Sequence, residues 1–234
     1  MMKYMGSKRR ICKDILPIML KNRHSGQYFV EPFCGGCNVI AHVDGNRLAA
    51  DINPYLIAMF QSLVKGERPP SIINKQIYEK ARNQYRCGVG ILSDFEIGWI
   101  GFMASFRAKF FGRYAGSSND GRDYVQEAID NIKPQIKLLK GIRFECCDYR
   151  QLLIPRHSIV YCDIPYKGTT RFGNTPTFSY NAFYKWCFLM KNEGHTLFIS
   201  EYAMPNDFQL VWEKPIVKNL GNQKPTRAER LYTL

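Results

Sequence analysis

The stretch between residues 27 and 51 constrains the fold of this chain more than any other part of its sequence. Residues 27–31 (QYFVE) read as a strand that runs straight into the turn PFCGG at 32–36. A helix is predicted over residues 38–42, and residues 47–51 (RLAAD) read as a second strand that ends in an acid. A strand, a Gly-rich turn, a helix and an acid-terminated strand form the opening of a nucleotide-binding α/β unit.

The remaining elements predict a sheet that is interrupted in the sequence by a mainly helical insertion. Apolar spacing and capping residues predict helices over residues 11–21, 54–64, 72–86, 94–106 and 123–139. Strand-like segments span residues 142–146, 158–162, 196–200, 208–212 and 230–234. Pro17 is expected to interrupt the first helix, and Asp123 is expected to cap the last. We therefore expect a catalytic domain made of residues 1–65 and 141–234, with residues 66–140 inserted into it.

The charge balance predicts a polyanionic partner. The chain carries 33 Lys and Arg against 20 Asp and Glu, a formal net charge of +13. Such an excess favours nucleic acid, and less often an anionic membrane. The longest apolar runs, such as residues 15–20, are far too short to span a membrane, and residues 1–4 lack the apolar core of a signal peptide. We therefore expect a nucleic-acid-binding protein that acts in the cytoplasm and does not bind membranes.

The cysteines give no sign of a metal or disulfide framework. With no export signal, the 8 cysteines are best interpreted as reduced thiols. Cys34 and Cys37 have the C-x-x-C spacing of a redox motif or of half a zinc site. A zinc site needs a second ligand pair, and Cys146 and Cys147 are too close-set to form a good one. We expect no metal site.

Three acids stand where a ligand would collect in an open α/β sheet, at the carboxyl ends of predicted strands: Asp51, Asp148 and Asp163. Gly35 and Gly36 allow the backbone to approach a ligand closely. Asp51 follows that turn by about sixteen residues, close to the spacing at which an acid binds a ribose hydroxyl. The alternative is that the glycines make only a tight turn and Asp51 caps the next helix.

The segment SIVYCDIPY at residues 158–166 predicts the reaction chemistry. A buried strand ends in Asp163, and a proline-stiffened turn leads to the ring of Tyr166. The Asp163 carboxylate and the carbonyl of Ile164 can both accept hydrogen bonds from one amine, which leaves the nitrogen lone pair facing an electrophile. Tyr166 offers a face on which a flipped-out base can stack. The alternative is a strand-ending turn in which Asp163 bonds only backbone amides.

These motifs resemble those of the Dam-type DNA adenine N6-methyltransferases, a phage and bacterial group with an Asp-Pro-Pro-Tyr catalytic motif. Residues 163–166 (DIPY) match that motif with Ile164 in the second place, where the backbone carbonyl is the contributing group. Other matching segments, in the family's order, are KYMGSK at 3–8 (with Tyr4 replacing Trp), FVEPFCGG at 29–36, ADIN at 50–53, FECCDY at 144–149 and ERLY at 229–232.

The resemblance implies a class I S-adenosylmethionine-dependent methyltransferase, with a Rossmann-like, seven-stranded mixed sheet and residues 66–140 as a target-recognition subdomain. It implies S-adenosyl-L-methionine as cofactor, double-stranded DNA as partner, and direct in-line transfer to the N6 amine of a flipped adenine. The implied catalytic residues are Asp163, Ile164, Pro165 and Tyr166. The implied cofactor-binding residues are Tyr4, Lys8, Glu31, Pro32, Phe33, Gly35, Asp51, Ile52, Asp148, Tyr149 and Asp163.

The basic residues and aromatics of residues 107–122 form the mixture that is typical of a duplex-binding surface. In this interpretation an aromatic ring such as Phe110 or Phe111 fills the gap left by the flipped base. The DNA-binding candidates are Lys3, Lys8, Arg107, Lys109, Arg113, Tyr114 and Arg122, with Lys224, Arg227 and Arg230 as further phosphate contacts. The alternative is that most of these charges form a solvated face.

Two rival functions remain open from the sequence. The same architecture can methylate cytosine N4, although that activity more often goes with Ser than with Asp at the position of Asp163. A basic DNA-binding protein can also keep the fold and lose catalysis, although the intact Asp163, Pro165 and Tyr166 argue against this. An adenine-specific enzyme of a bacterial or phage-infected cell, of the kind found in restriction–modification, is the prediction.

Overall fold

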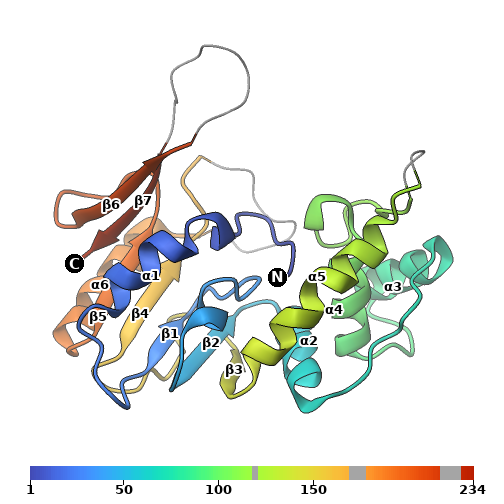
Figure 1. Ribbon diagram of the computed structural model, residues 1–234, viewed down its shortest axis with the longest axis horizontal. Coiled ribbons are helices and arrows are strands. Elements are labelled where there is room, and N and C mark those ends of the chain that lie inside the picture. Colours follow the sequence, from blue (N-terminus) through green and yellow to red (C-terminus); the bar gives the residue numbers. More distant parts are fainter. Residues whose placement is uncertain (118–120, 169–177, 217–227) are drawn as a thin grey trace, which may run out of the picture.

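A seven-stranded mixed sheet forms the centre of the computed structural model, which describes residues 1–117, 121–168, 178–216 and 228–234. Its strand order is β3-β2-β1-β4-β5-β7-β6 (Figure 1). The strands are β1 (Phe29–Glu31), β2 (Arg47–Asp51), β3 (Ile142–Cys146), β4 (Ile159–Asp163), β5 (Thr196–Ser200), β6 (Gln209–Pro215) and β7 (Ala228–Thr233). The first five run parallel, and β7 is antiparallel to both β5 and β6. The predicted α/β architecture with a seven-stranded mixed sheet is confirmed.

Helices cover both faces of the sheet, and alternate strand residues enter two separate apolar clusters. Phe29 and Tyr161 pack with residues of α1, α2 and α5 on one face. Val30 and Val160 pack with α6 on the other. Because both faces are buried, β1 and β4 are apolar along nearly their whole length, which is typical of parallel strands. The helices are α1 (Cys12–Leu20), α2 (Pro54–Lys65), α3 (Lys75–Cys87), α4 (Asp94–Met103), α5 (Tyr124–Leu139) and α6 (Tyr180–Asn192).

Local sequence explains where most helices begin. Asn53 caps α2 by accepting hydrogen bonds from the amides of Tyr55 and Leu56, and Asp123 caps α5 as predicted. Ser93 forms a capping box with Glu96 at the start of α4. These side chains satisfy amides that have no partner inside their helices.

Two expectations about helices need correction, and one helix was missed. The helix predicted over residues 38–42 is only a short 3-10 turn, Ile40–His42. Pro17 lies inside α1 and does not interrupt it. Helix α6 was not predicted, although its buried residues Phe183, Trp186 and Cys187 follow helical spacing.

Helices α3, α4 and α5 lie beside α2 at the β3 end of the sheet, opposite the antiparallel pair β6–β7 (Figure 1). A Cβ at Gly98 in α4 would come within 2.1 Å of the Tyr55 carbonyl oxygen in α2, so the two helices meet at backbone distance. The insertion therefore packs against α2, the helix that follows β2. Within the described residues, no helix has the length and apolar character needed to cross a membrane.

Candidate active site

The Gly-rich turn after β1 is fastened to the end of β2 by backbone hydrogen bonds and by one carboxylate. The Cys34 amide donates to the Ala50 carbonyl at 2.8 Å, and the Gly35 amide donates to Asp51 Oδ2 at 3.1 Å. The Asn53 amide donates to Asp51 Oδ1 at 2.9 Å. Burial raises the pKa of the Asp51 carboxyl, while these amides act in the opposite direction. Asp51 therefore anchors the turn, and the cap of α2 is Asn53, contrary to the alternative that Asp51 caps this helix.

Tyr4 covers the Gly-rich turn from the N-terminal segment. A Cβ at Gly35 would lie 2.7 Å from Tyr4 Cε1, and a Cβ at Gly36 would lie 2.7 Å from both Tyr4 Cβ and Asn38 Nδ2. Gly35 also has φ +45°, which side chains with a Cβ rarely adopt. The turn thus requires glycine at two successive positions because of Tyr4, which is itself a predicted cofactor-binding residue.

Glu31 ends β1 beneath this turn and carries an unpaired acceptor. Its side chain is 3% exposed, and its Oε1 atom has no hydrogen-bond partner among the described residues. Burial raises the pKa of the Glu31 carboxyl well above its usual range, and the nearby charge of Asp163 adds to that rise. The neighbouring Pro32 is also buried. A buried acceptor without a donor indicates a place for a ligand group.

Aromatic side chains gather beyond the ends of β1 and β3. The rings of Phe33 and Tyr149 lie 5.1 Å apart, and Tyr149 meets Trp186 of α6 at 5.1 Å. Asp148, beside Tyr149, is held by the Arg150 guanidinium at 2.7 Å, which lowers the pKa of that carboxyl. Ile52, which follows Asp51, leaves 44% of its surface exposed. These predicted cofactor-binding residues line the same edge of the sheet as Asp51.

Asp163 ends β4 and is paired with a lysine from the start of the chain. Lys8 Nζ lies 3.0 Å from Asp163 Oδ1 and 3.6 Å from Glu229 Oε2, and Lys8 is only 6% exposed. Burial raises the pKa of the Asp163 carboxyl, and the Lys8 charge holds that rise back. The alternative reading, in which this carboxylate bonds only backbone amides, does not account for the ion pair.

The residues after Asp163 are held by side chains from distant parts of the sequence. The Tyr166 hydroxyl donates to Glu229 Oε2 at 2.9 Å, and its ring packs against Tyr202 at 4.5 Å. The Tyr180 hydroxyl donates to the Pro165 carbonyl at 2.8 Å, whereas the Ile164 side chain is buried. Tyr166 is 8% exposed, so the surrounding side chains hold its ring in one position at the side of the site.

Two acids of this cluster were not predicted as site residues. Glu229 belongs to the ERLY segment, which matches the resembled family but was not predicted to supply a site residue; the segment lies in β7. Glu201, at the end of β5, accepts hydrogen bonds from the amides of Lys167 and Tyr202 at 2.9 and 2.6 Å. It ties the catalytic turn to its neighbouring strand. The motif match included Glu229, but spacing alone could not show that it contacts Lys8 and Tyr166.

Comparison with known proteins shows which enzymes this chain is similar to. Residues 4–86 match the family model for D12 class N6 adenine-specific DNA methyltransferases. The retron Ec67 DNA adenine methylase of Escherichia coli is 24% identical over 221 residues, which cover 85% of this chain and 75% of that protein. The DNA adenine methylase of Salmonella typhi is 26% identical over 231 residues, covering 88% and 76%. The type II methyltransferase M.FokI of Planomicrobium okeanokoites is 24% identical over 190 residues, covering 71% of this chain and 29% of that protein.

These comparisons support an adenine-specific DNA methyltransferase that is similar to the D12 class. The matched range contains the Tyr4 and Gly35 contact and Asp51, and it ends before Asp163. The longer matches to the two adenine methylases extend over most of the chain.

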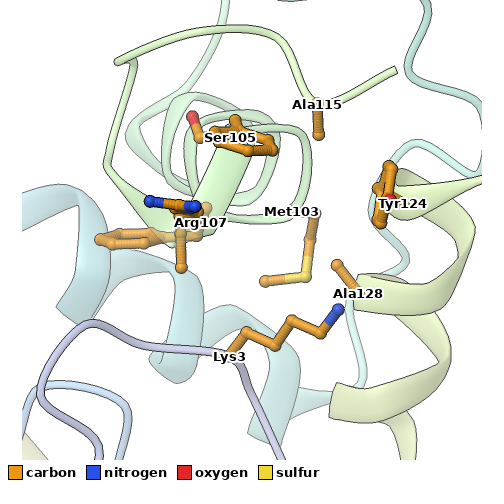
Figure 2. A pocket seen from close by; sticks show the side chains of 10 residues that line it. Lys3, Met103, Ser105, Arg107, Ala115, Tyr124 and Ala128 are labelled. Atoms are coloured by element: carbon orange, nitrogen blue, oxygen red, sulfur yellow. The ribbon is translucent and has the colours of Figure 1, made fainter. Parts of the chain in front are cut away.

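A cavity of about 310 Å³ opens in this methyltransferase between the N-terminal segment and the insertion. Figure 2 shows Lys3 on one side of it and Arg107 on the other, with Met103 and Tyr124 on its walls. The guanidiniums of Arg107 and Arg113 lie 5.3 and 4.7 Å from the ring centre of Phe106. Arg107, Lys109 and Arg113 are exposed, as a DNA-contacting role requires.

Other DNA-binding candidates are engaged within the protein. Lys3 and Arg122 both pair with Glu127, at 2.6 and 2.7 Å. Arg230 donates to the Tyr202 carbonyl at 2.6 Å and pairs with Glu213. Lys224 and Arg227 lie outside the described residues.

The aromatic residues of the 107–122 segment pack within the insertion, and the expectation that one of them fills a gap in DNA stays a prediction. Phe111 is 4% exposed, and Phe110 packs against Phe102 of α4 at 4.5 Å. The half-buried Tyr114 donates its hydroxyl hydrogen bond to the Ile73 carbonyl at 2.9 Å. Bridges at Ser105–Tyr114 and Ser117–Asp123 give the segment hairpin-like pairing; residues 118–120 lie outside the described part.

The cysteines around the Gly-rich turn are buried free thiols. Burial raises the pKa values of both Cys34 and Cys37, which disfavours the thiolate needed for metal binding or redox chemistry. In the described ranges, no group of three or more His, Cys, Asp or Glu side chains is arranged to hold a metal ion.

Proposed function

We propose that this methyltransferase moves a methyl group from S-adenosylmethionine to the N6 amine of a flipped-out adenine in double-stranded DNA. The observation that carries the proposal is the meeting of two sets of groups at one sheet edge. Asp163 ends β4 and Tyr166 follows it, while the Gly-rich turn follows β1 and Asp51 ends β2. A base amine and a nucleotide cofactor could therefore be held side by side.

The residues around the Gly-rich turn fit the charge and shape of S-adenosylmethionine. Glu31 Oε1 is a buried acceptor that the described chain leaves without a donor, and the ammonium of a methionine moiety is a donor of suitable charge. Gly35 and Gly36 expose backbone where a Cβ would collide with Tyr4. Asp51 would meet the ribose with the lone pairs that its two amides leave free, and Phe33 and Tyr149 would contact the adenine.

The chain's own part in the reaction is to hold and orient the amine. Asp163 Oδ and the Ile164 carbonyl accept the two N–H groups, which turns the nitrogen lone pair toward the cofactor. Tyr166, fixed by its hydroxyl bond to Glu229, supports the base from one side. The bound cofactor supplies an electrophilic methyl group on a sulfonium centre. Asp163 Oδ is then the nearest acceptor for the proton that the methylated nitrogen releases.

Residues 66–140 serve as the target-recognition part in this proposal. The exposed cations Arg107, Lys109 and Arg113 project from the segment that lies beside the cavity of Figure 2. They would contact the phosphate backbone. Losing one such contact lowers the affinity for DNA and also makes that affinity less dependent on salt concentration.

Arg107→Ala is therefore expected to raise the KM for DNA and leave the KM for the cofactor unchanged.

The test is methyl transfer from labelled S-adenosylmethionine to unmethylated genomic DNA, followed by analysis of the labelled base. Label in N6-methyladenine, reduced by about 10³-fold or more in Asp163→Ala, supports the proposal. The exposed Asp207 provides a matched control, and Asp207→Ala should retain full activity. Label in N4-methylcytosine would change the base assignment, and DNA binding without any label would indicate a catalytically silent protein.

A further inference from the structure

Lys8 makes four contacts within the catalytic cluster. Besides its 3.0 Å contact with Asp163 and its 3.6 Å contact with Glu229, its Nζ lies 3.2 Å from the Gly6 carbonyl oxygen and 4.3 Å from the ring centre of Tyr166. An ammonium has three N–H donors, and three oxygen acceptors surround it here. Lys8 therefore has a fixed position in the described structure.

Two of these contacts are the ones that the target base needs. The proposed function requires an amine N–H to reach the Asp163 carboxylate and the base to lie against the Tyr166 ring. The Lys8 ammonium already donates to that carboxylate and already lies against that ring. A cation over an aromatic face and an N–H donor on a carboxylate imitate the base and its amine.

We propose, on the basis of the proposed function, that Lys8 occupies the place of the target amine in the DNA-free enzyme and moves to Glu229 when adenine arrives. Lys8 and Glu229 are then positioning residues for base capture. The amine replaces the ammonium as donor to Asp163. A base that carries a carbonyl group where adenine has its amine offers no N–H to replace the Lys8 ammonium.

Glu229 is suited to receive the displaced ammonium. Its Oε2 atom is only slightly farther from Lys8 Nζ than Asp163 Oδ1 is, so a small movement completes the exchange. A buried ammonium without a counter-charge would be strongly disfavoured, and Glu229 keeps the charge paired throughout. The same carboxylate accepts the Tyr166 hydroxyl, which links the two positions of Lys8 to the ring that supports the base.

A double-mutant cycle tests this exchange. Steady-state methylation of unmethylated genomic DNA would be measured for the wild type, Lys8→Met, Glu229→Gln and the double variant, at alkaline pH so that Asp163 remains ionised. Glu229→Gln should raise the KM for DNA by about tenfold, because Lys8 loses its second carboxylate. Lys8→Met should lower that KM below the wild-type value. In the Lys8→Met background, Glu229→Gln should no longer raise it.

The controls separate this inference from a purely structural role. The exposed Lys13→Met variant removes the same charge from α1 and should leave the KM for DNA unchanged. The KM for S-adenosylmethionine tests the other role implied for Lys8, which is cofactor binding: a constant value supports the exchange, and a rise in the Lys8 variants overturns it. Lys8→Gln, which keeps a polar side chain in the site, should lower the KM for DNA in the same direction and serves if Lys8→Met does not fold.

The inference is overturned if Glu229→Gln raises the KM for DNA equally with and without Lys8, because Glu229 then acts only through Tyr166. It is also overturned if neither Lys8 variant lowers that KM. A wild-type enzyme that makes no N6-methyladenine would instead overturn the proposed function. The two failures are therefore distinguishable.

Discussion

The two halves of the active site are held in different ways. On the cofactor side, Asp51 is fixed by main-chain amides of Gly35 and Asn53, and the turn that it anchors follows the adjacent strand. On the catalytic side, Asp163 is fixed by Lys8 from the start of the sequence, and Tyr166 is fixed by Glu229 from β7. One half is built from neighbouring backbone and the other from long-range side-chain contacts.

This difference teaches where each half can tolerate change. Backbone that approaches within van der Waals distance leaves no room for an added carbon, so the cofactor half should respond to shape. A charge cluster responds instead to the loss of a counter-charge, so the catalytic half should respond to pH and to neutralising substitutions. Three further predictions use this contrast.

The largest effect is expected from Gly36→Ala on the cofactor half. The new Cβ would lie 2.7 Å from Tyr4 Cβ and Asn38 Nδ2, so Tyr4 or the turn must move. Cofactor affinity should fall about 10- to 100-fold, the size of an overpacking cost, while kcat at saturating cofactor changes little. Equilibrium binding of labelled S-adenosylmethionine measures this. Gly112→Ala, whose Cβ would lie no closer than 3.1 Å to the side chain and carbonyl oxygen of Lys109, is the matched control.

The second prediction concerns the pH dependence of the catalytic half. Burial raises the pKa of Asp163 and Lys8 opposes that rise, and the reaction needs the ionised carboxylate. Activity should therefore fall as pH decreases through this raised pKa. Lys8→Met removes the opposing charge, so the acid limb of the kcat profile should move to higher pH. An acid limb that stays in place would mean that Lys8 does not control the charge of Asp163; Lys13→Met gives the baseline.

The smallest effect is expected from Asn53→Ala, next to the Asp51 anchor. Its side chain accepts hydrogen bonds from the amides of Tyr55 and Leu56 at 3.1 and 3.2 Å, and the main-chain amide that contacts Asp51 is kept in this variant. Loss of the cap should lower the free energy of unfolding by about 1 kcal/mol. Urea denaturation measures the loss, and kcat at saturating substrates should be unchanged. A large fall in kcat would show that the two halves are less independent than their contacts indicate.

The same contrast explains how much could be predicted from the sequence. The strands β2 and β3 were predicted with their observed bounds, and the Gly-rich turn with its acid was found, because their signals lie within a few residues of one another. The predicted helix at residues 38–42 shortened to a 3-10 turn because the chain there lies between the Gly-rich turn and β2.

The catalytic half could be predicted only in part. The DIPY motif located Asp163 and Tyr166, but no spacing rule connects either residue with Lys8 or Glu229. The packing of the insertion's aromatics could not be predicted, because a Phe in a basic segment has the same sequence whether it faces DNA or, like Phe111, its own core. Only the packing of α3 and α4 decides between the two.

The position of β7 has a consequence for how the enzyme becomes active during synthesis. This strand follows every other strand of the sheet in sequence, yet it lies between β5 and β6. Asp163 therefore leaves the ribosome well before Glu229 is made, and β6 cannot take its place in the sheet until β7 arrives. A nascent chain that already carries the whole cofactor half should thus lack a complete catalytic centre. Methylation is then delayed until β7 has paired with β5.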